Sequence, residues 1–169
     1  GTLGATLDDS VAEAGNTTPD PISLQRQLAQ WRDQGVHSVS MEVSSHALVQ
    51  GRVNGVEFET AVYTNLSHDH LDYHGSMDAY GRAKLQLFAS EGLRHAVINQ
   101  DDDYAAQVRA AVAAGVKILS YSISGASADV QVDQVSGMPQ LLITVDRQAI
   151  ARYGINVVDV QDVIRTAVG

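Results

Sequence analysis

The stretch EFETAVYTNLSHDHLDYHG, residues 57–75, joins an apolar run to a polar loop that holds three histidines and two aspartates. The run at residues 57–66 is rich in β-branched and aromatic side chains, a composition that predicts a β-strand. Similar short runs recur at residues 36–43, 95–100 and 117–124. The sequence therefore predicts four strands, one of which leads directly into the polar loop.

Helical patterns separate these runs. Asp20 followed by Pro21 predicts the start of a helix, and Gly35 predicts its end. Residues 76–90 and 101–114 carry apolar side chains at helical spacing. Because strands and helices alternate, we expect an α/β fold with a mostly parallel sheet flanked by helices. Functional loops in such sheets follow the carboxyl ends of the strands, where the polar loop lies.

The last quarter of the chain follows a different pattern. Residues 128–169 predict two strands around a Gly-Met-Pro turn and then two short helices, a ββαα segment. This segment contains no histidine, cysteine or glutamate. We therefore expect no catalytic group in it.

Composition limits the function. A net charge of −9 and a pI near 4.9 exclude a general binder of nucleic acid or of anionic membranes, because phosphate groups would be repelled. The absence of cysteine excludes disulfides and thiol catalysis. No apolar run approaches the roughly 20 residues of a membrane span, and residues 1–15 do not resemble a signal peptide. We expect a soluble protein with a small-molecule substrate, no nucleic-acid partner and no membrane partner.

The histidine-rich loop permits two interpretations. His68, His70, Asp72 and His74 alternate, and on a loop they could converge on a divalent metal. A metal-dependent hydrolase resembling the metallo-β-lactamase superfamily is one alternative, although Tyr73 stands where its third histidine belongs. The other is a polar loop whose histidines cap the ends of strands and helices.

Lys84 is a second candidate for chemistry. It falls four residues after Tyr80 and four before Phe88, so the amine shares a helix face with two aromatic rings. The side chain either buries its stem and extends its charge to water, or is kept neutral by partial burial and adds carbon dioxide. The resulting carbamate would be an oxygen ligand suited to magnesium.

Five motifs occur in one order along the chain: NTTPDP (16–21), MEVSSHAL (41–48), QGRV (50–53), TNLSHDHLDYHGSMDAY (64–80) and AKLQLF (83–88). Together they resemble the central domain of the Mur ligases, and within that family the MurE branch of UDP-N-acetylmuramoyl-tripeptide synthetases. The resemblance covers about residues 1–127. It implies ATP-dependent addition of a diamino acid, meso-diaminopimelate or lysine, to UDP-N-acetylmuramoyl-L-alanyl-D-glutamate in cytoplasmic peptidoglycan synthesis, through an acyl phosphate.

The resemblance also implies a set of site residues. Magnesium ions that screen the phosphates of ATP would be held by Glu42, His70 and a carbamylated Lys84, the three catalytic candidates. The forked guanidinium of Arg52 suits a carboxylate or a phosphate. The full set expected to contact the UDP-muramoyl dipeptide is Asn16, Thr17, Thr18, Ser44, Gln50 and Arg52.

Two features depart from the family pattern. No Gly-Lys-Thr or Gly-Lys-Ser occurs, so the loop that binds ATP is missing from these 169 residues and we expect no ligase turnover by the isolated chain. Residues 128–169 resemble instead the porter region of heavy-metal efflux pumps of the RND type, notably in VSGMPQL and VDRQAIARYGINV. We therefore expect a chimera joined near residues 125–130, with a fragment of an efflux transporter as the alternative function.

Overall fold

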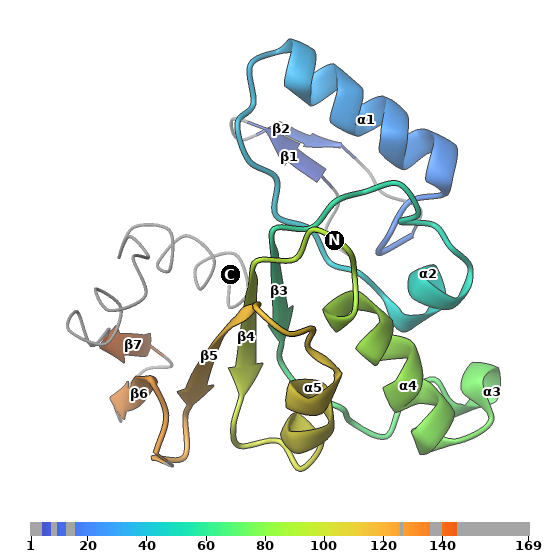
Figure 1. Ribbon diagram of the computed structural model, residues 1–169. Helices are drawn as coiled ribbons and strands as arrows, with labels where there is room; N and C mark the ends of the chain where they lie inside the picture. The colour runs from blue at the N-terminus through green and yellow to red at the C-terminus, as the bar shows by residue number, and fades with distance from the viewer. Residues whose placement is uncertain (1–4, 8–9, 13–15, 126, 136–139, 145–169) are drawn as a thin grey trace. The chain divides into compact units, whose positions relative to one another are not determined.

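The computed structural model describes residues 5–7, 10–12, 16–125, 127–135 and 140–144 (Figure 1). Its contacts divide the chain into two compact units. The first unit comprises Gly1–Val56 and His70–Gln86, and the second comprises Glu57–Asp69 and Leu87–Gly169. Each unit is described separately below.

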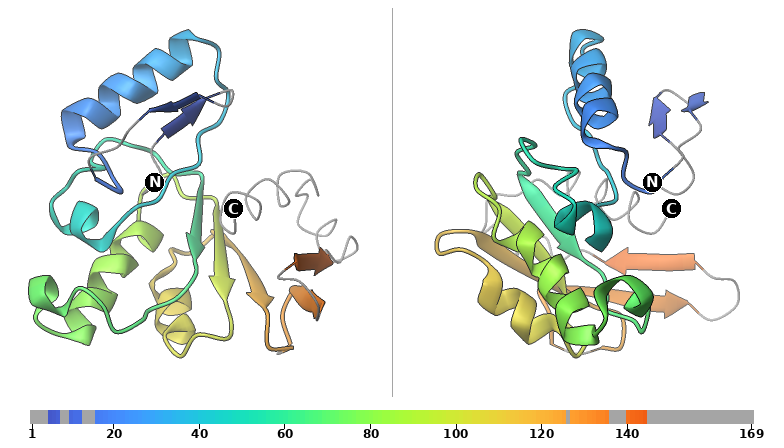
Figure 2. Two further views of the ribbon diagram at one scale, coloured as in Figure 1. Left: turned by 180° about the vertical axis from the view of Figure 1, so that it is seen from behind. Right: turned by 90° about the vertical axis from the view of Figure 1, so that its right-hand side faces the viewer.

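A five-stranded sheet forms the second unit. Neighbouring strands from β3 to β6 are parallel, and β7 is antiparallel to β6 (Figure 2). This arrangement confirms the expected α/β class with a mostly parallel sheet. In the order of the sheet, the strands are β3 (Thr60–Tyr63), β4 (His95–Asn99), β5 (Lys117–Ser122), β6 (Val130–Val135) and β7 (Gln140–Thr144).

Alternating burial explains why these short segments form strands. Along β4 every second residue is buried, and Ala96 and Ile98 are fully enclosed. Helix α5 (Ala105–Ala111) packs on β4 and buries Val108 completely (Figure 1). The ring centroids of Tyr63 and Phe88, both about 2% exposed, lie 6.2 Å apart in an edge-to-face contact.

The first unit contains a two-stranded antiparallel hairpin and most of the helices. In α1, the carboxylate of Asp20 accepts hydrogen bonds from the backbone N–H groups of Ile22 and Ser23, as expected for a helix N-cap. Ser76 caps α4 in the same way, through Ala79. The elements are β1 (Ala5–Leu7), β2 (Ser10–Ala12), α1 (Pro21–Asp33), α2 (Ser45–Val49), α3 (Leu71–His74) and α4 (Met77–Phe88), of which the last two residues belong to the second unit.

Some predicted elements were wrong. Residues 36–43 form no strand, because a strand needs a neighbouring backbone to pair with and no described segment pairs with this one. The helix predicted at residues 101–114 is shorter, since its first residues form a turn in which the backbone N–H of Tyr104 donates to Asp102. Of the predicted ββαα segment, the two strands are confirmed as β6 and β7, while both helices lie outside the described residues.

Candidate functional site

Every residue that the sequence assigned to substrate or magnesium lies in the first unit. These residues come from four places: the segment before α1, the entrance and exit of α2, the start of α3 and the middle of α4. Asn16, Glu42 and Gln50 are exposed, whereas His70 and Lys84 are half-buried. The structure therefore collects in one compact unit groups that are far apart in the sequence.

Thr18 joins two of these segments. Its side chain is fully buried, and its hydroxyl donates to the backbone carbonyl of Glu42 at 3.0 Å. The same hydroxyl oxygen accepts a hydrogen bond from the backbone N–H of Ser44, also at 3.0 Å. Ser44 in turn caps α2, because its Oγ accepts from the backbone N–H of Ala47. Thr18 thus fixes the backbone on both sides of Val43 and the start of α2.

A chain of hydrogen bonds runs from Thr18 through Arg52 and Gln50 to Tyr73. The guanidinium of Arg52 donates to the carbonyl oxygen of Thr18 at 2.9 Å and to Oε1 of Gln50 at 2.8 Å. The Nε2 of Gln50 donates to the hydroxyl of Tyr73 at 3.0 Å. Three of the predicted substrate residues are thereby linked, and Arg52 keeps N–H groups that can bind an anion.

His70 adopts an unusual backbone conformation. Its φ of 56° lies in the left-handed region, where no other described non-glycine residue is found. It precedes α3, and Gly75, also left-handed, ends that helix. Histidine tolerates this region better than most residues, but the conformation is costly and such outliers gather at functional sites. The observation supports a role for His70 beyond packing.

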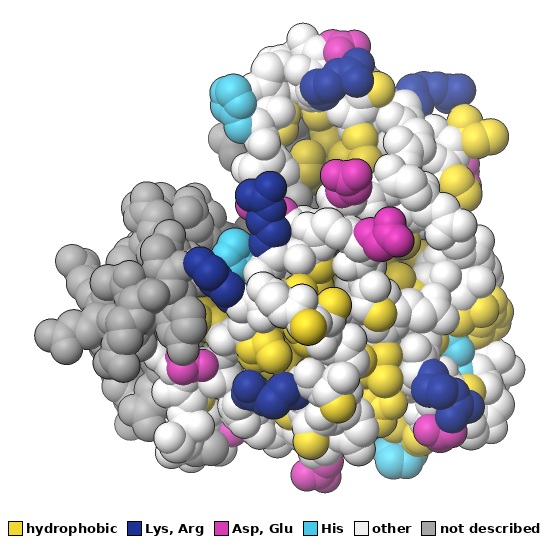
Figure 3. Space-filling model, in the orientation of Figure 1, with side chains coloured by type: hydrophobic (Ala, Val, Ile, Leu, Met, Phe, Trp, Pro, Cys, Tyr) yellow, Lys and Arg dark blue, Asp and Glu magenta, His cyan; other side chains and the backbone are white. Residues whose placement is uncertain are grey.

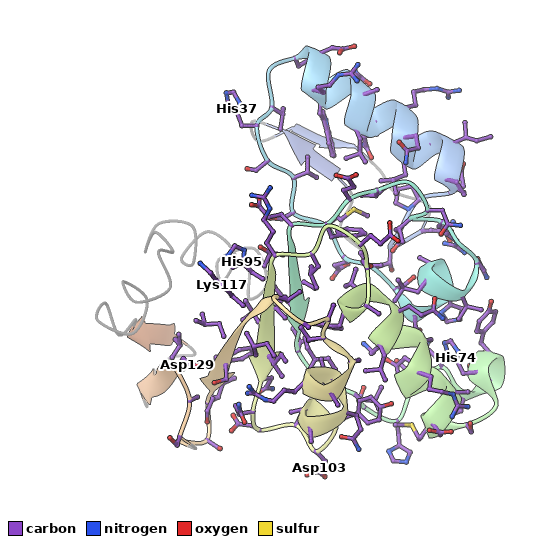
Figure 4. All side chains as sticks on the ribbon, in the orientation of Figure 1. His37, His74, His95, Asp103, Lys117 and Asp129 are labelled. Atoms are coloured by element: carbon purple, nitrogen blue, oxygen red, sulfur yellow. The ribbon has the colours of Figure 1, made fainter. Side chains whose placement is uncertain are left out.

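Aromatic and imidazole rings cluster around His70. The ring centroid of His46 lies 4.9 Å from that of His70 and 5.3 Å from that of His74. Tyr80 contacts both His70, edge-on at 5.7 Å, and His74, stacked at 5.2 Å. Figure 4 shows His74 between α3 and α4. Sequence analysis identified the loop as a candidate site but did not identify His46. Its position within the MEVSSHAL motif is the feature that could have pointed to it.

His74 links α3 to α2. Its Nε2 lies 2.9 Å from the hydroxyl of Ser45 on α2. Burial lowers the pKa of His74, and the neighbouring His46 and His70 lower it further, while Asp72 acts in the opposite direction. These surroundings favour the neutral imidazole over the charged one.

Lys84 lies against an aromatic ring, as its helical spacing predicts. Its Nζ is 5.3 Å from the centroid of the Tyr80 ring, within range of a cation–π interaction. Tyr80 is only 5% exposed. The same ring therefore contacts the amine of Lys84 and the imidazole of His70, two of the three groups expected to bind magnesium.

The three-histidine metal site is not formed. Nowhere in the part of the chain that the structure describes are three His, Asp or Glu side chains placed to hold a metal ion. His68 is exposed, and His74 is engaged with Ser45 and Tyr80. The convergence of the loop histidines on one metal ion, on which the hydrolase alternative was based, is therefore not seen among the described residues, where His70 and His74 make ring contacts instead.

Charged side chains are spread over the surface. On the face drawn in Figure 3, charged side chains of both signs are scattered and form no continuous basic patch among the residues described. Several pair with an opposite charge, as Arg32 does with Asp33 and Arg94 with Glu59. Within the described residues, no helix has the length and apolar character needed to cross a membrane.

The fold and site define a class. A family model described as the Mur ligase middle domain matches residues 1–153, and the chain belongs to the Mur ligase family. This confirms the family to which the five motifs pointed. The match continues beyond residue 127, where the resemblance to efflux pumps was expected to begin. The domain boundary there and the efflux origin of residues 128–169 remain predictions, to be tested by sequencing the encoding DNA across the junction.

Proteins similar in sequence to this chain include UDP-N-acetylmuramoyl-L-alanyl-D-glutamate–2,6-diaminopimelate ligases. The chain is 58% identical to that of Chromobacterium violaceum over 112 residues, which are 66% of this chain and 23% of the relative. It is 48% identical to that of Xylella fastidiosa over 137 residues, 80% of this chain and 28% of the relative. A solved structure of a ligase with this name superposes with a TM-score of 0.70 at 42% identity, covering 78% of this chain and 27% of that one. The chain thus spans about a quarter of the length of these relatives.

Proposed function

We propose that the chain is the part of an ATP-dependent ligase that binds UDP-N-acetylmuramoyl-L-alanyl-D-glutamate and assists the addition of a diamino acid to it. The observation that carries this proposal is the hydrogen-bonded chain from Thr18 through Arg52 to Gln50, which joins three predicted substrate residues in a family member. The relatives that match over most of this chain carry the name of that reaction with 2,6-diaminopimelate as the amino acid. The cytoplasmic location implied by the resemblance is part of the proposal.

The substrate has groups that suit these residues. Its diphosphate and its carboxylates are anions, and the guanidinium of Arg52 can pair with either through two parallel N–H donors. Asn16 and Gln50 are both exposed, and their side-chain amides can form hydrogen bonds with sugar and peptide groups. Thr18 contributes through the backbone that it orders, because its own hydroxyl already bonds to Glu42 and Ser44.

The donor chemistry of the proposed magnesium site fits the metal. Glu42 offers an exposed carboxylate and His70 an imidazole, and Lys84 would add an oxygen ligand after its neutral amine attacks carbon dioxide and releases a proton. Magnesium, when bound, neutralises the negative charge of phosphate groups. Tyr80 would hold the Lys84 side chain beside His70, through the contacts that its ring makes with both.

Binding measurements on the 169-residue protein test the substrate part of the proposal. Titration calorimetry with UDP-N-acetylmuramoyl-L-alanyl-D-glutamate should give saturable binding, and Arg52→Ala should weaken it about 10-fold or more, the effect of losing a charge-assisted pair. Arg109→Ala, an exposed change on α5, is the matched control and should leave the affinity unchanged. Absence of saturable binding to the unaltered chain would contradict the proposal.

Mass spectrometry tests the modification separately. Under gentle conditions with dissolved carbon dioxide, one carbon dioxide adduct should form and should disappear in Lys84→Met. Lys117→Met is the matched control, because Lys117 is the only other lysine and lies at the amino end of β5 beside His95 (Figure 4). An adduct that survives in Lys84→Met and disappears in Lys117→Met would exclude Lys84 as the modified residue.

A further inference from the structure

Tyr73 is a residue of this site that neither the motif resemblance nor the proposed function has given a role. Its hydroxyl accepts a hydrogen bond from Nε2 of Gln50, whose Oε1 accepts one from Arg52. Both ends of the Gln50 amide are therefore engaged, one by a donor and the other by an acceptor. Reversing the amide would turn its NH₂ group toward the guanidinium, where two donors would face each other. Arg52, which can only donate, therefore selects this orientation of the amide, and the Tyr73 hydroxyl, which can donate or accept, holds its Nε2 end in place.

The tyrosine ring is held in place by its neighbours. Its centroid lies 4.1 Å from that of His46 and 4.9 Å from that of His74. His74 is in turn tied to Ser45 at the start of α2, the helix that leads into Gln50. The hydroxyl of Tyr73 is thus fixed relative to Gln50 through the rings of two histidines.

The contact is poorly explained by a structural role alone. The side chain of Tyr73 is 42% exposed and Gln50 is also exposed, so a hydrogen bond between them exchanges with water and adds little to the stability of the fold. It does, however, settle the direction in which Gln50 presents its second N–H. Fixing a polar group before a ligand arrives lowers the entropy lost on binding.

We propose that Tyr73 is a positioning residue, which orients the amide of Gln50 so that its remaining N–H, beside the guanidinium of Arg52, meets an acceptor oxygen of an anionic ligand. The inference rests on the proposed function, and the ligand class is that of the UDP-linked muramoyl dipeptide. Tyr73 acts through Gln50 and not by touching the ligand itself. Its effect must therefore disappear when Gln50 no longer has an amide.

A double-mutant cycle on the 169-residue protein tests this coupling. The affinity for UDP-N-acetylmuramoyl-L-alanyl-D-glutamate is measured by calorimetry for the unaltered chain and for Tyr73→Phe, Gln50→Ala and the double variant. Tyr73→Phe keeps the ring contacts with His46 and His74 and removes only the hydroxyl. It should weaken binding about 3- to 10-fold, the effect of one neutral hydrogen bond, whereas the double variant should bind as Gln50→Ala does.

Two further measurements separate positioning from folding. Tyr73→Phe should unfold in urea at the same midpoint as the unaltered chain, and Tyr121→Phe in the other unit should change neither midpoint nor affinity. Unchanged affinity in Tyr73→Phe, or effects of the two single changes that multiply in the double variant, would overturn the inference while leaving the proposed function intact. An unaltered chain that fails to bind the ligand would overturn both.

Discussion

Asp101 holds together the loops that follow β4 and β5, and replacing it with alanine should destabilise the second unit. Its two carboxylate oxygens accept from the hydroxyls of Ser122 and Ser124 and from the backbone N–H groups of Ile123 and Ser124, at 2.5 to 3.0 Å. Ser122 is fully buried. Asp101→Ala removes the carboxylate to which this buried hydroxyl donates at 2.7 Å.

The expected loss follows from these contacts. Losing a hydrogen bond between a buried hydroxyl and a carboxylate costs about 1–3 kcal/mol, and a net hydrogen bond at a solvated site adds about 1 kcal/mol or less. Because Asp101 itself is exposed, solvent replaces part of what its other bonds supply. We therefore expect Asp101→Ala to lower the free energy of unfolding by about 2–3 kcal/mol at pH 7.

The pH dependence supplies the sharper test. Burial acts to raise the pKa of Asp101, but hydrogen bonds from Ser124 and Ser122 outweigh it and hold the pKa well below the ordinary value of 3.8. The folded state therefore favours the carboxylate. Its stabilisation is fully present above pH values near 4 and is lost as the pH falls below the ordinary pKa toward the folded one.

Urea unfolding at pH 7 and at pH 2.5, followed by circular dichroism, measures both effects. The difference between the unaltered chain and Asp101→Ala should shrink at the lower pH, with similar dependence on urea concentration in both proteins. Asp103→Ala, two residues along at an exposed position (Figure 4), is the matched control. A loss below about 0.5 kcal/mol at pH 7, well under that expected when a buried hydroxyl loses a charged partner, or an equal loss at both pH values, would refute the reasoning.

Five further substitutions have defined expectations. Thr18→Val should lower the free energy of unfolding by about 1–3 kcal/mol in urea titrations, because its buried hydroxyl bonds both Glu42 and Ser44; Thr18→Ser should restore most of the loss. Tyr63→Phe should cost about 1–2 kcal/mol, since the Tyr63 hydroxyl donates to Asp102 at 2.5 Å, and an unchanged midpoint would argue against this. Lys84→Met should keep the fold, judged by circular dichroism, while Tyr80→Ala, at a buried position, should lower the unfolding midpoint.

Helices α1, α4 and α5 and the strands of the five-stranded sheet could be predicted because their signals are local, whereas the short helices α2 and α3 and the hairpin β1–β2 were not predicted. Asp20 and Pro21 fix the start of α1 whatever surrounds it, since a helix cap uses backbone groups within three residues. The alternation of buried residues in β4 is likewise a pattern of consecutive residues in the sequence. Residues 36–43 carried the same strand signal and form no strand, because pairing depends on a partner that local sequence does not specify.

The sequence by itself determined the family, the alternation of strands and helices, and the residue types available to a ligand. The tertiary structure decided which of them meet. Arg52 reaches a carbonyl 34 residues away and Gln50 a hydroxyl 23 residues away. His70 and His74 meet His46 of α2 in ring contacts, and no group of three metal-binding side chains is found among the described residues. These contacts depend on the position of each side chain in the folded chain. Tertiary packing sets those positions, and the spacing of residues along the sequence does not specify them.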